Sequence, residues 1–577
     1  MATASSGKNE ALENLDGEEE RDRDQRIERR TSADDAHPCP TCQGARLKTD
    51  SLHVRVGNRT PAELNIMSAR VACEWFSQLR FSGRDQQLAR DVIPQIVERL
   101  RFMSEVGLDY LGLGRAAITL SGGEAQRIRL ASQLGSNLRG VLYVLDEPTI
   151  GLHSRDNERL LRVLDRLKAR GNSLLVVEHD EETMRRADWI IDLGPGAGKQ
   201  GGEVVWQGKP TASNFKSGFS NSRTLDFLTN PMRHPIRGKR RDLKNASWFS
   251  VEGATLHNLK KVRVRFPQGR LTVVTGVSGA GKSSLVRGTL LHGLKHPSSP
   301  WRKILKNPKL ISAAYEVDQA PIGKTPRSCP ATYLGIWDEI RRLFASTPSA
   351  RIRGYTTSRF SFNVSGGRCE TCEGQGRVKL AMSFMPDAYV PCETCGGARF
   401  GTETLEILYR DRNITQVLEM SAEEAVAFFS FDRRIAQPLQ LLVDTGLGYL
   451  SLGQSSPTLS GGEAQRMKLV SELMRGRHPS AVGNLYVLEE PTIGLHFADV
   501  EKLIGVLHQL VDSGHTAIVI EHNMDLIAEA DYIVDLGPEG GNEGGRVVAT
   551  GTPEEVARCK SSHTARFLKK VLVRSAR

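Results

Sequence analysis

The stretch Gly276-Val277-Ser278-Gly279-Ala280-Gly281-Lys282-Ser283 matches the phosphate-loop pattern G-x-x-x-x-G-K-[ST]. It follows the apolar run 271–274 and precedes a predicted helix from Ser284, in the order that the pattern requires. Glycines let backbone amides approach anionic oxygens, and a helix N-terminus adds partial positive charge. We expect Lys282 to reach the outer phosphates and the Ser283 hydroxyl to bind Mg²⁺. The stretch therefore predicts a site for ATP or GTP.

Composition limits the class of protein. The 577 residues suffice for about four domain-sized units. Because no run of about 18 apolar residues occurs and the start is polar, we expect a cytoplasmic protein with no membrane partner. The formal net charge is +11 although residues 1–36 are net acidic, which favours a polyanionic partner such as nucleic acid. Ordinary solvated surface charge explains the same number, so net charge alone does not decide.

A long internal repeat indicates two related α/β lobes. The segments 120–127, 144–153 and 178–179 recur as 459–466, 487–496 and 521–522, and a C-x-x-C-x-G-A-R segment occurs at both 39–46 and 392–399. The lobes are expected to join within the stretch 211–247.

The copies are unequal, because lobe two carries the phosphate loop ahead of its C-x-x-C pair and lobe one begins at the matching pair. We predict a disordered charged tail at 1–36, a first lobe without its front half at 37–230, and a complete second lobe at 231–577.

In each lobe an apolar run delivers two acids to the carboxyl edge of a predicted parallel sheet, where α/β proteins bind ligands. Residues 141–145 precede Asp146 and Glu147, and 485–488 precede Glu489 and Glu490. The first acid is expected to hold Mg²⁺, directly or through water, and the second to activate the attacking water.

The segment Ser121-Gly122-Gly123-Glu124 opens a predicted helix in lobe one. Ser-x-x-Glu before a helix is the pattern of a capping box, which is the modest interpretation. Capping does not require two adjacent glycines. They leave the helix amides bare, so we expect this N-terminus to meet a phosphate supplied from elsewhere.

Four cysteines in lobe two have the spacing C-x2-C-x19-C-x2-C. This spacing suits a structural tetrahedral Zn²⁺ site, and disulfides are the weaker alternative. The four ligands are Cys369, Cys372, Cys392 and Cys395. In residues 377–384, apolar side chains alternate with basic or small ones. This alternation predicts a strand with one buried apolar face and one basic face. Cys39 and Cys42 form half a site, which is either vestigial or completed by another chain.

The phosphate loop, acid pair, later histidine and Leu-Ser-Gly-Gly-Glu segment resemble the ATP-binding-cassette ATPases. The fuller string resembles the UvrA family, the damage-sensing subunits of bacterial nucleotide excision repair. This resemblance runs from about residue 37 to the C-terminus and rests on both Leu-Ser-Gly-Gly-Glu-Ala-Gln-Arg copies, the cysteine modules, and segments 150–153, 192–198 and 355–364. It implies two cassette-type α/β lobes, the first truncated, with a zinc hairpin at 365–400 inserted in the second.

In cassette ATPases, ATP lies between the phosphate loop of one head and the signature of the other. The resemblance therefore implies one complete site, with cofactor-binding and catalytic residues Gly276, Val277, Ser278, Gly279, Ala280, Gly281, Lys282, Ser283, Ser284, Gln319, Glu489, Glu490 and His522 from lobe two and Ser121, Gly122, Gly123 and Gln126 from lobe one. The opposite site lacks a phosphate loop and is expected to be empty or weak.

Position 489 departs from the family, which has Asp there. The extra methylene moves the carboxylate by about an ångström, and such a displacement costs up to about a hundredfold in rate. We therefore expect ATP to bind well and to be hydrolysed slowly.

The resemblance places duplex DNA near the zinc hairpin. It nominates eight cations, each of which also reads as a solvated surface charge: Lys324, Arg327, Arg351, Arg353, Arg359, Arg368, Arg377 and Lys379. Such contacts would sense backbone shape and deformability rather than base identity.

The implied function is ATP-dependent binding of damaged double-stranded DNA as an excinuclease subunit, with hydrolysis through Glu490 and His522. One alternative is a non-hydrolysing DNA-binding scaffold or resistance-type paralogue, and another is one piece of a split gene. Membrane transport is disfavoured. The family's surface for its partner UvrB lies in the part that lobe one lacks, so this partnership is left open. A homodimer is also left open.

Overall fold

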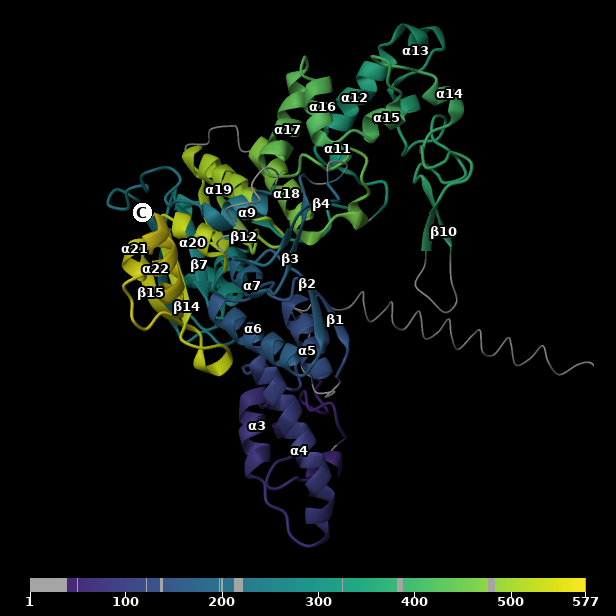
Figure 1. Cartoon of the computed structure of the whole chain (residues 1–577). Helices are drawn as coiled ribbons and strands as arrows, with labels where there is room; N and C mark the ends of the chain where they lie inside the picture. The colour runs from purple at the N-terminus through teal and green to yellow at the C-terminus, as the bar shows by residue number, and fades with distance from the viewer. Residues whose placement is uncertain are drawn as a thin grey trace, which may run out of the picture. The chain divides into compact units, whose positions relative to one another are not determined.

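The computed structural model describes residues 39–48, 50–120, 122–134, 139–196, 198, 201–211, 222–323, 325–380, 388–475 and 483–575 (Figure 1). The chain divides into two compact units between residues 137 and 138. The predicted tail 1–36 lies outside the described residues. Because the residues of the first predicted lobe fall in both units, the predicted domain boundaries stay a prediction. None of the described helices is long and apolar enough to cross a bilayer.

The first unit is helical. Its elements are η1 (Asp50–His53), α2 (Pro61–Ile66), α3 (Ala69–Gln78), α4 (Arg84–Glu105), η2 (Ala117–Thr119) and α5 (Gly122–Leu134). Thr60 begins α2 with a capping box, since its backbone amide donates to Glu63 at 2.7 Å and its hydroxyl accepts from the Glu63 amide. Helices α3 and α4 pack on a small core that includes Ala72 and Leu100.

The second unit begins with the rest of lobe one. Its elements are β1 (Leu142–Asp146), α6 (Ser154–Ala169), β2 (Ser173–Val177), α7 (Glu181–Arg186), β3 (Ile190–Gly194), β4 (Glu203–Gly208) and α9 (Arg223–Thr229). Strand β1 pairs with β2 in parallel, and β3 pairs with β4 in antiparallel fashion. These are two separate two-stranded sheets.

Lobe two is built on a six-stranded sheet with the order β15-β14-β7-β13-β12-β9. Its strands are β7 (Leu271–Gly276), β9 (Ala314–Val317), β12 (Leu485–Glu489), β13 (Thr516–Ile520), β14 (Tyr532–Gly537) and β15 (Arg546–Gly551). All pairings are parallel except that of the edge strand β15. Strand β7 lies between β13 and β14 and is buried over its whole length, as expected for a central parallel strand.

Each face of this sheet carries its own core. One face packs against a three-stranded antiparallel sheet and the helix after the phosphate loop. The sheet consists of β5 (Trp248–Ala254), β6 (Val262–Pro267) and β8 (Leu305–Lys306), and the helix is the π-helix η4 (Ser284–Leu291). Three short helices accompany them: α10 (His292–Lys295), η5 (Pro300–Ile304) and η6 (Pro308–Leu310). The other face packs against helices that include α19 (Phe497–Asp512), α20 (Met524–Glu529), α21 (Pro553–Val556) and α22 (His563–Ser575). The turn η9 (Gly541–Glu543) joins β14 to β15.

A helical insertion occupies the middle of lobe two. Its elements are α11 (Pro330–Tyr333), α12 (Ile336–Ala345), α13 (Pro348–Ile352), η7 (Thr357–Phe360), α14 (Thr402–Leu405), α15 (Ile414–Leu418), α16 (Ala422–Phe428), α17 (Arg433–Asp444), η8 (Ser456–Thr458) and α18 (Gly461–Arg475). Phenylalanines such as Phe344, Phe362 and Phe400 fill its core.

A hairpin of β10 (Arg377–Leu380) and β11 (Ala388–Pro391) projects from this insertion (Figure 1). The predicted strand is present, but its expected apolar face is not buried: Val378 packs against the cysteines, whereas Leu380 is 48% exposed. The prediction was wrong at Leu380 because beyond the cysteines no described layer covers the hairpin. Residues 381–387 lie outside the described residues.

Candidate nucleotide-binding site

The phosphate loop connects β7 to η4, which confirms the predicted strand, loop and helix order. Gly276, Gly279 and Gly281 all have positive φ, at +131°, +74° and +100°. A Cβ at Gly276 would lie 2.0 Å from the Leu536 carbonyl oxygen of the neighbouring strand. Glycine is therefore required there for both conformation and space.

Two polar groups of this loop are buried. The Lys282 Nζ donates to the carbonyl oxygens of Gly276 and Val277 at 3.1 and 3.2 Å. Burial lowers the pKa of Lys282, against the nearby carboxylates of Glu490, Asp156 and Glu489. The Ser278 hydroxyl is buried and has no hydrogen-bond partner within the described part of the chain. A phosphate would satisfy both groups, so the loop fits the phosphate groups of a nucleotide.

The first acid of lobe two reaches the loop directly. The Ser283 hydroxyl donates to the Glu489 carboxylate, whose second oxygen accepts from an Arg287 Nη at 2.8 Å. Arg287 also donates to Glu316. Hydroxyl and carboxylate oxygens are suitable Mg²⁺ ligands, so Ser283 and Glu489 fit this ion. We did not predict Arg287 from the sequence, although its place four residues after Ser283 on a predicted helix indicates a shared face.

The second acid has the same local structure in both copies. Glu490 has a φ of +46° and Glu147 a φ of +42°, and their amides donate to Ile520 and Val177 of the adjacent strand at 2.8 and 2.9 Å. Positive φ at a non-glycine residue is strained and gathers at functional sites.

Each of these glutamates faces the predicted histidine. The His522 Nε2 is 3.9 Å from Glu490, and the His179 Nε2 is 3.4 Å from Glu147. The contact with Glu147 raises the pKa of His179, against burial. The acid and histidine predicted on separate strands are thus brought together in both lobes.

The predicted Gln319 follows β9 and is exposed. A Cβ at Gly461 would lie 3.3 Å from its Oε1, so Gln319 lies beside the signature of its own lobe. From that signature helix, Gln465 donates to the carbonyl oxygens of Val317 and Glu489 at 2.8 Å each. Helix α18 is therefore tied to the strands that carry Gln319 and Glu489.

The Ser-Gly-Gly-Glu segment of lobe two, 460–463, forms a capping box, the simpler of the two interpretations of this pattern. The Ser460 amide donates to Glu463 at 2.7 Å, and the Glu463 amide donates to the Ser460 hydroxyl at 3.2 Å. In lobe one, Gly122, Gly123 and Gln126 lie in the first turns of α5, and Ser121 lies outside the described residues. The phosphate contact of the first signature stays a prediction.

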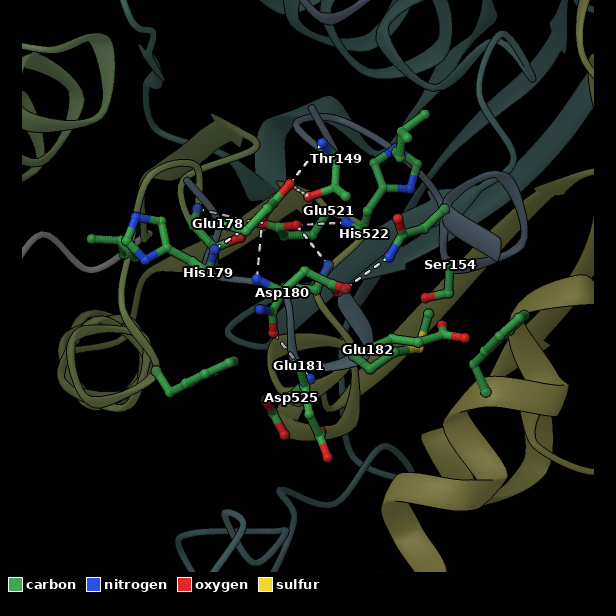
Figure 2. A pocket seen from close by; sticks show the side chains of 18 of the residues that line it. Thr149, Ser154, Glu178, His179, Asp180, Glu181, Glu182, Glu521, His522 and Asp525 are labelled. Atoms are coloured by element: carbon green, nitrogen blue, oxygen red, sulfur yellow. Dashed lines mark hydrogen bonds between the residues drawn. The ribbon is translucent and has the colours of Figure 1, made fainter. Parts of the chain in front are cut away.

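The second acids of the two copies, Glu147 and Glu490, both line one cavity of about 370 Å³ (Figure 2). A Cβ at Gly151 would lie 3.0 Å from Glu490, and one at Gly494 would lie 3.6 Å from Glu147. Figure 2 shows Glu178 and His179 from one copy beside Glu521 and His522 from the other. Each lobe therefore presents its Gly-Leu-His turn to the acid of the other.

The histidines of these two turns also contact the opposite lobe. His153 contacts Thr564 at 3.0 Å, and His496 contacts Thr224 at 3.1 Å. Asp156, at the start of α6, accepts from the Ser278 amide at 3.4 Å. Lobe one thus touches the phosphate loop through a carboxylate that we did not predict. The repeat in the sequence identifies equivalent residues but not which of them meet.

The four predicted zinc ligands form one cluster. Their sulfur atoms lie within 4.8 Å of one another, with Sγ separations of 4.0 Å for Cys369–Cys392 and 3.7 Å for Cys372–Cys395. Zn–S bonds of about 2.3 Å in a tetrahedron give separations near ~3.8 Å, so the cluster fits Zn²⁺. Among the described residues no third metal-binding side chain joins Cys39 and Cys42.

Half of the predicted DNA-binding cations are paired with nearby acids. The pairs are Arg327–Glu373 at 3.0 Å, Arg353–Glu406 at 2.6 Å, Arg359–Glu403 at 2.6 Å and Arg368–Glu370 at 3.0 Å. Arg351, Arg377 and Lys379 are exposed, and Lys324 lies outside the described residues. Neighbouring acids therefore compensate the charge of these four cations.

The site and the sheet that carries it define an ATP-binding-cassette fold. No protein-family model matches the sequence. The chain is 54% identical to UvrABC system protein A of Thermus thermophilus over 92% of its length and 56% of that relative, and 52% identical to that of Micrococcus luteus over 93% and 54%. The crystal structure of UvrA2 from Deinococcus radiodurans matches with a TM-score of 0.84 and 46% identity, over 92% of this chain and 66% of that one. The chain belongs to the UvrA family, which confirms the predicted fold class. It spans about half the length of the curated relatives it matches.

Proposed function

We propose that the chain binds ATP and Mg²⁺ and uses them to control binding to damaged double-stranded DNA, as a UvrA-type excinuclease subunit. One observation carries the proposal: Lys282, Ser283, Glu489 and Glu490 converge on one phosphate loop whose buried Ser278 hydroxyl has no partner among the described residues. The relatives carry the name of a UvrABC system protein, and the repair role is inferred from that membership.

In the proposed mechanism Lys282 and the loop amides hold the phosphates. Glu489 and Ser283 would hold Mg²⁺, which neutralises the charge that develops on the phosphates. Glu490 accepts a proton from the attacking water, and His522 lies near the terminal phosphate. By family resemblance, Ser121, Gly122, Gly123 and Gln126 of the first signature complete the site. ATP binding would then reshape the DNA-facing surface, and hydrolysis would release the DNA.

Steady-state turnover of ATP tests the enzymatic part. We expect slow turnover that Lys282→Ala abolishes and that damaged duplex changes. The matched control is Lys295→Ala, because Lys295 ends helix α10, which follows η4, and lies 3.9 Å from Glu316. Turnover that survives Lys282→Ala would place the activity elsewhere.

DNA affinity tests the second part. We expect tighter binding to damaged than to intact duplex, with a steep dependence on salt because phosphate contacts release counterions. Removal of both Arg377 and Lys379 on the hairpin should weaken binding to both duplexes. Equal affinity for damaged and intact DNA with and without ATP would contradict the repair role.

The second candidate is a DNA-binding scaffold that does not hydrolyse ATP. The observation in its favour is the ion pair of Arg287 with Glu489, which engages the carboxylate expected to hold Mg²⁺. ATP affinity that depends on Lys282, together with no turnover, would favour the scaffold.

A further inference from the structure

Arg399 joins the cysteine cluster to a distant part of lobe two. Its backbone belongs to the cluster, because it follows Cys395 by four residues and its carbonyl oxygen accepts from the Cys369 amide at 2.9 Å. Its φ of +69° lies in the left-handed region, which is strained for a residue other than glycine. Strain of this kind gathers at functional sites, and the cluster fixes where the Arg399 side chain begins.

The guanidinium of Arg399 bonds to a turn outside the cluster. One Nη atom donates to the Gly453 carbonyl oxygen at 2.7 Å and to the Ser455 hydroxyl at 3.4 Å. The other Nη is buried and has no hydrogen-bond partner in the described part of the chain, and none of the described carboxylates pairs with this cation. Thiolates that hold Zn²⁺ carry net negative charge, which a nearby buried cation compensates. Arg399 thus fits the cluster by charge and the turn by hydrogen bonding.

The stem of Arg399 packs on the start of the zinc hairpin. A Cβ at Gly376 would lie 3.1 Å from the Arg399 Cγ, and the Gly376 amide donates to the Cys372 Sγ at 3.2 Å. Gly376 immediately precedes β10, which carries the exposed cations Arg377 and Lys379. A displacement of the hairpin therefore reaches the Arg399 stem directly, because Gly376 has no side chain between them.

The turn that accepts from Arg399 is fixed on its other sides. We call residues 453–458 the signature turn, because the signature segment begins at the next residue. The Gly453 amide donates to the Leu418 carbonyl oxygen at 2.7 Å, and the Ser456 amide donates to the Ser328 carbonyl oxygen at 2.8 Å. A Cβ at Gly453 would lie 2.9 Å from the Leu418 side chain, so the turn has little room to relax. It therefore passes on a movement of Arg399 rather than absorbing it.

The signature turn leads to the nucleotide site. Its helical part is η8, and the signature and α18 follow it along the chain. A Cβ at Gly461 would lie 3.3 Å from the Gln319 Oε1. Gln465 of α18 donates to the Glu489 carbonyl oxygen at 2.8 Å. A connected set of contacts thus runs from the hairpin through Arg399 to the acid expected to hold Mg²⁺.

The corresponding residues of lobe one lack an acceptor for such a link. Arg46 ends the matching C-x-x-C-x-G-A-R segment, and its side chain is exposed. Ala116 stands where lobe two has Ser455, and an alanine side chain accepts no hydrogen bond. The link is therefore a feature of lobe two, which carries the phosphate loop.

We propose that Arg399 is a positioning residue that transmits the state of the zinc hairpin to the signature turn, and through α18 to the nucleotide site. Its consequence for turnover rests on the proposed function, since it requires DNA at the hairpin and ATP at the phosphate loop. The link between the cluster and the turn rests on the contacts alone.

Arg399→Met tests the link in steady-state turnover of ATP. The substitution removes the charge and the donors but keeps an unbranched stem over Gly376 and the backbone contact with Cys369. The zinc content should therefore equal that of the parent chain. We expect basal turnover to equal that of the parent as well, whereas the change in turnover that damaged duplex causes should be lost.

Two comparison variants separate a specific link from general damage. Lysine keeps the charge and a single donor group without the planar fork of arginine, so Arg399→Lys should restore part of the duplex response. Arg46→Met removes the matching arginine of lobe one and should leave the response unchanged.

Ser455→Ala tests the link from the turn. The bond from Arg399 to Gly453 remains in this variant, so we expect a partial loss of the duplex response. In the Arg399→Met background, Ser455→Ala should have no further effect, because the interaction that it removes is already absent.

Amide hydrogen exchange provides a measurement that needs neither ATP nor DNA. In the parent chain, removal of the bound metal with a chelator should speed exchange in residues 453–470. In Arg399→Met, exchange there should be the same with and without metal. If exchange follows this pattern but the parent shows no turnover or no duplex response, the link is correct and the proposed function fails.

Three results would overturn the link itself. The first is a duplex response that Arg399→Met leaves intact. The second is a loss of zinc from Arg399→Met that accounts for its lost response, because the residue would then only hold the metal site together. The third is exchange in residues 453–470 that depends on the metal equally in the parent and in Arg399→Met.

Discussion

At the scale of single residues, the repeated segments 144–153 and 487–496 differ at their first acid. Lobe one has Asp146, and lobe two has Glu489, which is one methylene longer. Glu489 uses that length to accept from both Ser283 and Arg287. Arg287 in turn bridges Glu489 and Glu316, so a protein cation already pairs with the acid expected to hold Mg²⁺, Glu489.

Arg287→Ala should therefore make nucleotide binding dependent on Mg²⁺. In the parent chain we expect similar affinity for an ATP analogue with Mg²⁺ or with a chelator. In the variant, Glu489 and Glu316 repel the phosphates unless Mg²⁺ is present, so affinity in chelator should fall about tenfold, or ~1.4 kcal/mol. Fluorescence titration measures both constants. Lys295→Ala is the control, because Lys295 is close to Glu316 but does not contact Glu489. A parent already tenfold weaker in chelator contradicts this prediction.

Glu489→Asp should increase turnover of ATP. The shorter side chain restores the acid found at Asp146 and no longer spans Ser283 and Arg287, so the carboxylate is free to hold Mg²⁺. A correction of about an ångström is worth up to a hundredfold in rate. The measurement is steady-state kcat with saturating Mg²⁺. If the variant is no faster than the parent, the extra methylene does not limit the reaction.

At the scale of elements, His234 connects the segment before β5 to helix α20 through two carboxylates. His234 contacts Glu529 at 2.6 Å and Asp525 at 3.0 Å, and Glu529 also contacts His508 at 3.0 Å. Burial lowers the pKa of His234, but the two carboxylates outweigh it and raise the pKa to about 9. Burial likewise raises the pKa of Glu529, but its hydrogen bonds bring it to about 2.

The stabilisation from His234 is full below pH 6.5 and is lost as pH rises through 9, because the unfolded chain loses this proton near pH 6.5. That from Glu529 is present above pH 4.5 and is lost as pH falls through 2. His234→Gln should lower the free energy of unfolding by about 3 kcal/mol at pH 6 and remove part of the decline between pH 6.5 and 9. Denaturant titrations at several pH values measure this. The exposed His296→Gln should change neither, and a parent curve without that decline contradicts the prediction.

The sequence predicts best those elements whose residues act through near neighbours. The phosphate loop follows from the order of its own residues, and the zinc cluster follows from two C-x-x-C pairs with suitable spacing. Contacts between distant segments are not predictable in this way, because local residue patterns do not show which of the repeated parts meet. The Asp156 contact with Ser278 and the exposure of Leu380 both depend on neighbours that only the folded chain supplies.

At the scale of the whole molecule, the second unit combines a symmetric framework with asymmetric chemistry. Each Gly-Leu-His turn faces the second acid of the other lobe. The histidine of each turn contacts a threonine of the other lobe, His153 with Thr564 and His496 with Thr224. Only one half carries a phosphate loop within the described chain. Equivalent changes in the two turns should therefore have unequal effects on catalysis.

Gly151→Ala and Gly494→Ala test this asymmetry as a matched pair. The two glycines have nearly equal φ values of +65° and +67°, so alanine costs each about 1 kcal/mol of backbone strain, and similar thermal unfolding is expected. A Cβ at Gly151 lies 3.0 Å from Glu490 and must displace that carboxylate, whereas one at Gly494 lies 3.6 Å from Glu147, an ordinary contact. Displacing the proposed base by a few tenths of an ångström should reduce kcat about tenfold with unchanged ATP affinity. Gly494→Ala should turn over like the parent. Equal losses in both variants would show that both acids serve one reaction, against the assignment of hydrolysis to Glu490.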